Sequence, residues 1–188
     1  MDRAKNGLSS RTKKEVSIIH HNVQSIGNCV DAVQDLLNVH EDCIAFCMSE
    51  HWKTESQLKS YNILGYELAS SHCRKAGAHG AVAVFIRKDV EWRVRNDIVN
   101  TSEDLVFECA AVEVRVNDFK TLILGVYRTP STAVQDFLPK LERVLMRVFN
   151  ENVPVLLLVI LILTLETVVE VQLTFYLYLA HLTFILLF

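Results

Sequence analysis

The sequence predicts an α/β fold in which strands outnumber helices, and two features carry this prediction. The chain opens with two short apolar segments, 16–21 and 43–48, on either side of a segment, 26–38, whose apolar residues recur at the spacing of an amphipathic helix. A series of strand-like segments follows and ends at a second amphipathic helix, 132–150. Elements in this order are typical of a fold in which helices cover the outer faces of paired sheets.

The first two strands should pair in parallel, because a helix connects them and a crossover of this kind joins parallel neighbours. Five more segments are rich in the β-branched and aromatic residues of strands: 61–70, 81–87, 92–99, 106–116 and 121–127. We expect a hairpin turn at 116–120, between the last two of them. The body of the chain is therefore predicted to be mostly sheet.

The composition suits one globular domain with an unusual end. The chain has 188 residues, 22% of them charged, and a net charge of −3, which excludes the global positive field of many nucleic-acid-binding proteins. All 19 Lys and Arg residues precede residue 153. We therefore divide the chain into a disordered basic arm at 1–14, a body at 15–155 and an apolar tail at 156–188.

The five cysteines are scattered along the chain without a CxxC pair. Their odd number and apolar surroundings favour reduced thiols, and therefore an intracellular protein of the nucleus or cytoplasm. No obligate protein partner is evident from the sequence.

Three polar residues stand at or beside the ends of predicted strands. Glu50 lies just past a buried strand, where α/β proteins place metal ligands and catalytic groups, and the alternative is a solvated loop residue. Asn22 follows the first strand, and it belongs to a site, caps the next helix or holds a turn. Tyr127 ends a later strand and either belongs to a site or is a half-buried strand residue.

The motifs around these residues resemble a known family. They are Asn22 after the first strand, SEHW at 49–52, GAVAVFIR at 80–87 and GVYRTP at 125–130. In this order, and over residues 15–155, the sequence resembles the endonuclease/exonuclease/phosphatase superfamily. Within that superfamily it resembles the apurinic-like endonuclease domain of non-LTR (LINE-type) retrotransposons.

The resemblance implies a two-sheet α/β sandwich, of which this chain holds the N-terminal part. It also implies Mg²⁺-dependent cleavage of phosphodiester bonds in DNA, the nick that primes reverse transcription of a mobile element. Asn22 and Tyr127 resemble active-site residues of the family, the latter positioning the phosphate, and Glu50 resembles its metal-binding glutamate. Carboxylate oxygen is a ligand that Mg²⁺ prefers, and a bound Mg²⁺ neutralises charge that develops on a phosphate.

Two of the family's motifs are missing. The resemblance requires a Gly-Asp-Phe-Asn motif soon after the second helix and a Ser-Asp-His motif near the end of the domain, and the 188 residues contain neither. Because the loss of members of a catalytic constellation typically costs several orders of magnitude in rate, we expect little or no catalysis. The chain is then a pseudoenzyme whose binding of Mg²⁺ is weakened.

A shift of reading frame is one explanation of the tail. The codons GGT GAT TTT AAT ATT GAC encode Gly-Asp-Phe-Asn-Ile-Asp, and when read one base later they give Val-Ile-Leu-Ile-Leu-Thr, which is the sequence of residues 159–164. Such a shift moves third codon bases into the middle position, where every T specifies Phe, Leu, Ile, Met or Val. Phe, Leu, Ile and Val supply 24 of residues 153–188, as the shift predicts.

Other interpretations of the tail stay open. Residues 171–188 are uncharged and reach the lower limit of length for a membrane-spanning helix, so the chain is alternatively a tail-anchored membrane protein. The tail is also rich enough in β-branched and aromatic residues to supply core strands. A third function is a non-catalytic nucleic-acid-binding remnant that uses the basic arm together with Arg74, Lys75, Arg87 and Lys88.

Overall fold

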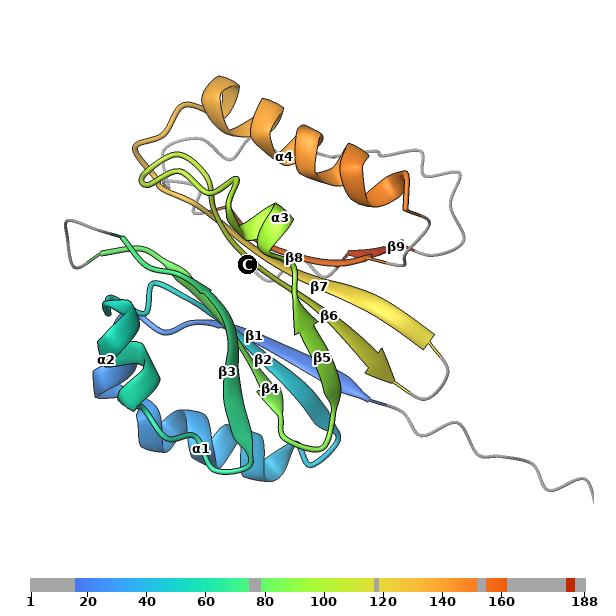
Figure 1. Cartoon of the computed structure of the whole chain (residues 1–188). Helices are drawn as coiled ribbons and strands as arrows, with labels where there is room; N and C mark the ends of the chain where they lie inside the picture. Colours follow the sequence, from blue (N-terminus) through green and yellow to red (C-terminus); the bar gives the residue numbers. More distant parts are fainter. Residues whose placement is uncertain (1–15, 75–78, 117–118, 152–154, 162–181, 185–188) are drawn as a thin grey trace, which may run out of the picture.

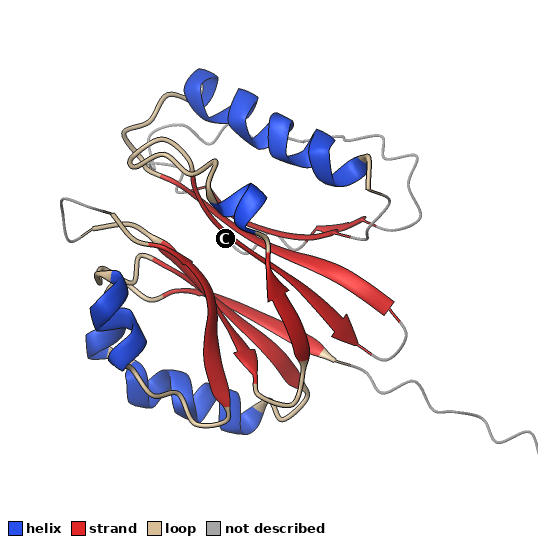
Figure 2. Ribbon diagram, in the orientation of Figure 1, coloured by secondary structure: helices blue, strands red, loops and turns tan. Residues whose placement is uncertain are grey.

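The protein contains two β-sheets packed face to face, with helices on the outer face of each (Figures 1 and 2). The structure, a computed structural model, describes residues 16–74, 79–116, 119–151, 155–161 and 182–184. The predicted arm at 1–14 lies outside these residues. The two-sheet α/β sandwich predicted from the sequence is confirmed.

The first sheet has the strand order β1-β2-β4-β3. The elements of this half are β1 (Ser17–Asn22), the 3-10 helix η1 (Ile26–Asn28), α1 (Val30–Val39), β2 (Cys43–Ser49), α2 (Glu55–Ser60), β3 (Tyr66–His72) and β4 (Val82–Arg87). As predicted, β1 and β2 are parallel neighbours joined by a helical segment. Val33 and Leu37 of α1 and Leu58 of α2 are buried on the outer face of this sheet.

The second sheet has the strand order β5-β6-β7-β8-β9. Its elements are β5 (Glu91–Val94), α3 (Asn96–Val99), β6 (Glu108–Val116), β7 (Phe119–Arg128), α4 (Val134–Phe149), β8 (Val155–Leu161) and β9 (Leu182–Phe184). The long helix α4 covers the outer face, where it buries Phe137, Val144 and Val148. The predicted hairpin joins β6 to β7 with Val116 opposite Phe119, and residues 117 and 118 of its turn lie outside the described residues.

Two predicted strands were wrong in part. Segment 61–70 becomes a strand only at Tyr66, and α2 precedes it, capped by Thr54, whose hydroxyl accepts the N–H of Gln57. Segment 92–99 is a strand only as far as Val94, and α3 follows. Arg95 ends the strand by forming two hydrogen bonds of 2.8 Å with Asp97, a residue type that is itself depleted in strands.

Part of the apolar tail belongs to the second sheet. Strand β8 pairs in parallel with β7, and β9 pairs in parallel with β8. Most of the candidate membrane segment 171–188 lies outside the described residues. Among the residues that the structure describes, no helix has the length and apolar character needed to span a bilayer.

Small residues let the two sheets approach closely where β2 crosses β7. Cys47 of β2 and Ala110 of β6 are fully buried between the sheets, and Gly125 of β7 lies against both. A Cβ atom on Gly125 would lie only 2.6 Å from the sulfur of Cys47. Glycine at this position therefore sets the distance between the sheets.

We expect the substitution Gly125→Ala to destabilise the fold by about 1–3 kcal/mol, because the added methyl group overpacks the core against Cys47. In a Cys47→Ala background the same substitution should cost much less, because the clashing sulfur is gone. Urea unfolding of the four proteins of this double-mutant cycle measures the coupling. Strictly additive costs would show that the two side chains do not share this space.

Candidate active site

The carboxyl ends of β1, β2 and β7 meet at one edge of the sandwich. Asn22 is the last residue of β1, and its partner across the parallel pair is Ser49 at the end of β2. Glu50 follows at once, and Tyr127 is the next-to-last residue of β7 in the facing sheet. The fold therefore brings the three residues singled out in the sequence to the same place from two different sheets.

One oxygen of Glu50 joins the three side chains. The amide nitrogen Nδ2 of Asn22 donates to Glu50 Oε1 over 3.3 Å, and the hydroxyl of Tyr127 donates to the same oxygen over 3.1 Å. Tyr127 is buried rather than half-buried, and Ser25, not Asn22, occupies the cap position of η1. The structure thus differs from two of the alternatives, a half-buried Tyr127 and an Asn22 that caps η1.

The backbone around Glu50 is strained. Among the described residues, six non-glycine residues have a positive φ, and five of them lie in the loops at this edge: Gln24, Ser25, Glu50, Trp52 and Ala81. Each such conformation costs on the order of 1–3 kcal/mol and persists only where its surroundings enforce it. Here the N–H of Glu50 donates to the carbonyl of Ala81 over 2.8 Å, and its carbonyl accepts the N–H of Ser25 over 2.9 Å.

His51 locks the loop that carries Glu50. Its ring is fully buried, its Nδ1 accepts the backbone N–H of Lys53 over 3.2 Å, and its Nε2 lies 3.3 Å from the carbonyl oxygen of His72. With Nδ1 as acceptor, Nε2 carries the proton and donates to that carbonyl. Burial lowers the pKa of His51 to about 4, so the ring is neutral at pH 7.

Tyr127 acts as a hydrogen-bond donor at this site. Burial raises the pKa of its phenol, and the negative charge of Glu50 and the hydrogen bond to it raise that pKa further. The hydroxyl therefore keeps its proton at physiological pH. It serves to orient Glu50 or to donate to another oxygen, and not as a base.

The oxygen atoms at this edge suit a hard cation, although they are few. Asn22 Oδ1 and the hydroxyl of Ser49 are buried and have no hydrogen-bond partner among the described residues. With the carboxylate of Glu50 they offer oxygen donors of the kind that Mg²⁺ takes. However, no cluster of three or more His, Cys, Asp or Glu side chains suited to a metal occurs in the described part of the chain. The residues therefore fit Mg²⁺ in type and supply one carboxylate.

The fold and this edge can be compared with solved structures. The endonuclease domain of TRAS1, a telomere-specific non-LTR retrotransposon, matches with a TM-score of 0.54 at 12% identity, over 75% of this chain and 57% of that one. An endonuclease/exonuclease/phosphatase family protein from Bacteroides thetaiotaomicron matches with a TM-score of 0.53 at 14% identity, over 76% of this chain and 61% of that one. The chain has the endonuclease/exonuclease/phosphatase fold.

A 3′-5′ exonuclease from Neisseria meningitidis has the same fold, with a TM-score of 0.53 at 15% identity over 76% of this chain and 56% of that one. The family resemblance seen in the four motifs is thus confirmed at the level of the fold. No protein-family model and no curated protein matches the sequence. The chain spans less than two thirds of the length of these three structures.

Sequence reasoning missed a buried ion pair beside Tyr127. Arg74, two residues past β3, donates from Nε to Oε1 of Glu108 over 2.5 Å, and both side chains are almost entirely buried. The guanidinium carbon of Arg74 lies 5.9 Å from the centroid of the Tyr127 ring. No local pattern predicts this pair, because 34 residues separate its members.

The other basic residues proposed from the sequence do not join Arg74. Arg87 ends β4 and binds Asp89 and the carbonyls of Glu41 and Cys43, which precede or begin β2. Because β4 runs antiparallel to β2, Arg87 and Lys88 lie at the end of the first sheet opposite to Glu50. Lys75 lies outside the described residues.

Two buried histidines make the fold sensitive to acid. Burial lowers the pKa of both His20 and His51 to about 4, so between that pH and the unfolded value of 6.5 the unfolded chain binds more protons than the folded one. The contribution of these two histidines to the free energy of unfolding is fully present above about pH 6.5. It is lost as the pH drops toward 4, by at most roughly 3 kcal/mol for each histidine.

Urea unfolding from pH 7 down to about pH 4 should show this loss. A His20→Leu variant should show a flatter dependence on pH, because its buried position no longer charges. The same change at His40, which is exposed, serves as the control and should leave the dependence as it is. Equal slopes for the two variants would contradict the assignment.

Proposed function

We propose that the chain derives from a metal-dependent phosphodiesterase that nicks DNA, and that its own catalytic site is incomplete. The observation that carries the proposal is the convergence of the Asn22 amide and the Tyr127 hydroxyl on one oxygen of Glu50, beside the unpartnered Asn22 Oδ1. Glu50 and Asn22 would hold Mg²⁺ through oxygen. When bound, the ion would neutralise charge on a phosphate group.

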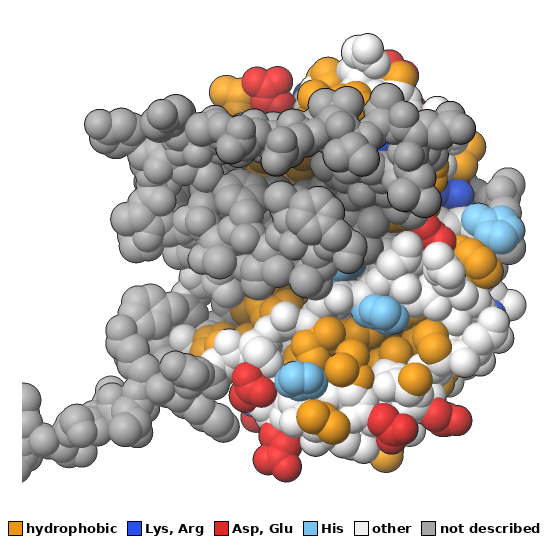
Figure 3. All heavy atoms as spheres, turned by 180° about the vertical axis from the view of Figure 1, so that it is seen from behind, with side chains coloured by type: hydrophobic (Ala, Val, Ile, Leu, Met, Phe, Trp, Pro, Cys, Tyr) orange, Lys and Arg blue, Asp and Glu red, His pale blue; other side chains and the backbone are white. Residues whose placement is uncertain are grey.

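Structures with the same fold support DNA as the substrate. A 3′ phosphatase from Neisseria, TM-score 0.54, is bound to a product DNA hairpin, and a D. rerio TDP2 structure, TM-score 0.53, is complexed with a single-strand DNA product. The described residues on the face shown in Figure 3 nevertheless form no broad basic area. On the face shown in Figure 3, Lys and Arg side chains appear only near the edges, while acidic side chains gather below.

The alternative is a nucleic-acid-binding remnant that uses Arg74, Lys75, Arg87 and Lys88 together with the basic arm at 1–14. The separation of Arg74 from Arg87 and Lys88 does not favour their joint use, while the arm and Lys75 lie outside the described residues. Binding by phosphate contacts alone would require positive charges on one surface. We therefore place the contact with DNA at the edge that carries Glu50. Its strength would depend on the metal more than on a basic patch.

Strand β8 lies where the out-of-frame hypothesis would put the missing motif. It runs parallel to β7, with Ile160 opposite Tyr127 and Leu161 opposite Arg128, so its carboxyl end reaches the candidate site. If residues 159–162 are encoded by the codons supposed above, reading them one base earlier would give Gly-Asp-Phe-Asn, with the aspartate at position 160. The out-of-frame interpretation thus puts the lost carboxylate on the strand beside Tyr127, at the edge where a second metal ligand is lacking.

We expect the purified chain to nick supercoiled plasmid DNA in Mg²⁺ no faster than its Glu50→Ala variant. The reason is that one carboxylate and one amide cannot replace a full constellation, and the loss amounts to several orders of magnitude in rate. Agarose gels of relaxed plasmid against time measure it. Nicking by the parent chain that disappears in Glu50→Ala would overturn the prediction.

The frame hypothesis has a direct test in the DNA that encodes residues 150–188. The frame that starts one base earlier at Val159 should give Gly-Asp-Phe-Asn and continue to a Ser-Asp-His. A protein translated from the repaired frame should then regain Mg²⁺-dependent nicking that Glu50→Ala abolishes. If no frame yields the two motifs, the apolar tail is the true product and the frame hypothesis fails.

A further inference from the structure

A buried carboxylate lies behind the candidate site. Glu108, the first residue of β6, is completely buried, and it is the cross-strand partner of Tyr127. Its oxygens accept three hydrogen bonds, from Arg74 Nε at 2.5 Å, from the N–H of Ala81 at 2.7 Å and from the N–H of Leu105 at 3.0 Å. A buried charge is tolerated only when it is paired and hydrogen-bonded in this way.

Arg74 extends from this carboxylate to the aromatic ring. Its Nη2 donates to Oγ1 of Thr129, the residue after β7, over 2.9 Å, so the guanidinium is fixed at both ends, to Glu108 and to Thr129. Its distance of 5.9 Å from the ring centroid of Tyr127 is within the range of a cation–π interaction. The guanidinium thus packs against the residue that donates to Glu50.

Residues 80 and 81 connect the same carboxylate to the backbone of Glu50. Ala81 donates its N–H to Glu108 and accepts the N–H of Glu50 at its carbonyl, over 2.7 and 2.8 Å. Gly80 has a φ of +92°, and a Cβ atom there would lie 2.0 Å from Nη2 of Arg74. Only glycine therefore allows both the backbone conformation and the close approach of the guanidinium.

We propose that Arg74 and Glu108 are positioning residues for the candidate site: Arg74 fixes the ring of Tyr127, and Glu108 anchors Arg74 and, through Ala81, the backbone of Glu50. Two routes then lead from one buried carboxylate to the two partners of the Tyr127–Glu50 hydrogen bond. The inference deepens the proposed function by naming what holds its site in place. Whether Arg74 fixes the ring of Tyr127 can be tested whether or not the chain cleaves DNA.

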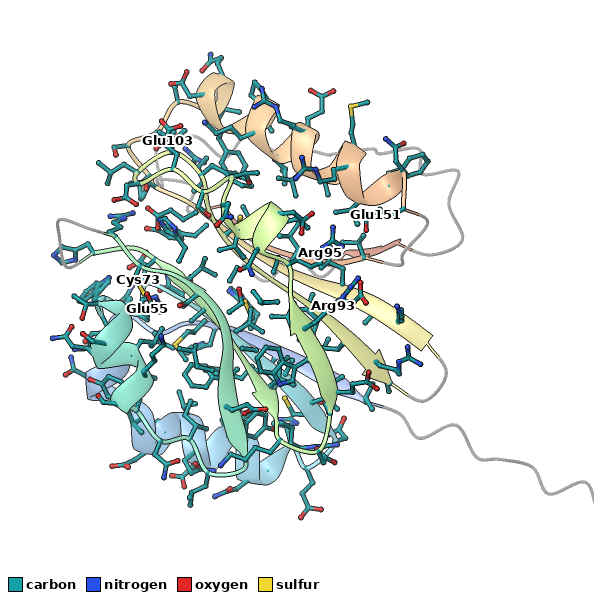
Figure 4. The ribbon with its side chains drawn as sticks, in the orientation of Figure 1. Glu55, Cys73, Arg93, Arg95, Glu103 and Glu151 are labelled. Carbon is teal, nitrogen blue, oxygen red and sulfur yellow. The ribbon has the colours of Figure 1, made fainter. Side chains whose placement is uncertain are left out.

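A second buried arginine provides a matched comparison. Arg95 is as buried as Arg74 and binds Asp97 and Glu151, both outside the candidate site. Figure 4 shows Arg95 and Glu151 next to each other and well apart from Glu103. Loss of Arg95 should destabilise the fold, because it leaves the partners of a buried ion pair without their cation. It should leave the position and surroundings of the Tyr127 ring unchanged.

The experiment places 3-fluorotyrosine at position 127 and records ¹⁹F NMR spectra of the full chain. We expect narrow signals from a fixed ring in the parent. In Arg74→Met these signals should broaden and shift toward the position of the free amino acid, because the guanidinium no longer holds the ring. In Arg95→Met the ¹⁹F signals should match those of the parent, even though urea unfolding shows lower stability.

Two further variants guard against a failure of Arg74→Met to fold. Gly80→Ala keeps every charge and displaces the guanidinium, while it also strains the left-handed backbone of residue 80, so it should reproduce the change in the ¹⁹F signals. Arg74→Lys keeps the positive charge but loses the guanidinium nitrogen that donates to Thr129. Its ¹⁹F signals should therefore fall between those of the parent and of Gly80→Ala. Unchanged signals in Gly80→Ala, or an equal change in Arg95→Met, would overturn the proposal.

Failure of the proposed function gives a different result. If plasmid nicking by a repaired chain does not depend on Glu50, the proposed function fails while the ¹⁹F result stands. If the repaired chain nicks DNA but its ¹⁹F signals do not change in Arg74→Met and Gly80→Ala, the proposed positioning role fails instead.

Discussion

The close approach of the two sheets at Gly125 is the constraint on which the rest of the structure depends. Because no side chain separates β7 from Cys47 of β2, the strand ends beyond this point come within hydrogen-bonding distance of each other. Tyr127 lies two residues past Gly125, on the same face of its strand, and reaches Glu50 three residues past Cys47. A wider spacing between the sheets would separate the two groups and leave the buried hydroxyl of Tyr127 without this hydrogen-bond partner.

The strained loops at this edge show how the protein maintains the arrangement. Glu50 has a left-handed backbone, and it is held between Ser25 on one side and Ala81, also left-handed, on the other. The stable sheets on either side over-determine these conformations, which short loops alone would not adopt. The buried Glu108 stabilises the same segment from behind, since it accepts the N–H of Ala81. Strain and buried charge are thus concentrated where the three predicted residues meet.

The sequence predicted the elements whose signals are local. Strand β2 could be predicted from its uninterrupted apolar run and α4 from its apolar spacing, whereas the two-sheet sandwich and the role of Glu50 followed from the family resemblance. Helix α2 was missed because it is only six residues long, although its capping box from Thr54 to Gln57 was a usable signal. Arg74 and Glu108 were not predictable as a pair, because only the folded sheets bring together a loop after β3 and the start of β6.

The charges and hydrogen bonds at the site explain how its geometry can be kept without a bound metal ion and without catalysis. Arg74 compensates the charge of Glu108, whereas Glu50 forms no salt bridge with any of the residues that the structure describes. Mg²⁺ held by a single carboxylate keeps most of its waters and binds weakly. Yet Glu50 Oε1 already accepts two hydrogen bonds, from Asn22 and Tyr127, and so is satisfied without a metal ion. A chain that lost the carboxylate on β8 would therefore keep the geometry of its first strands, since hydrogen bonds within the protein stabilise that geometry.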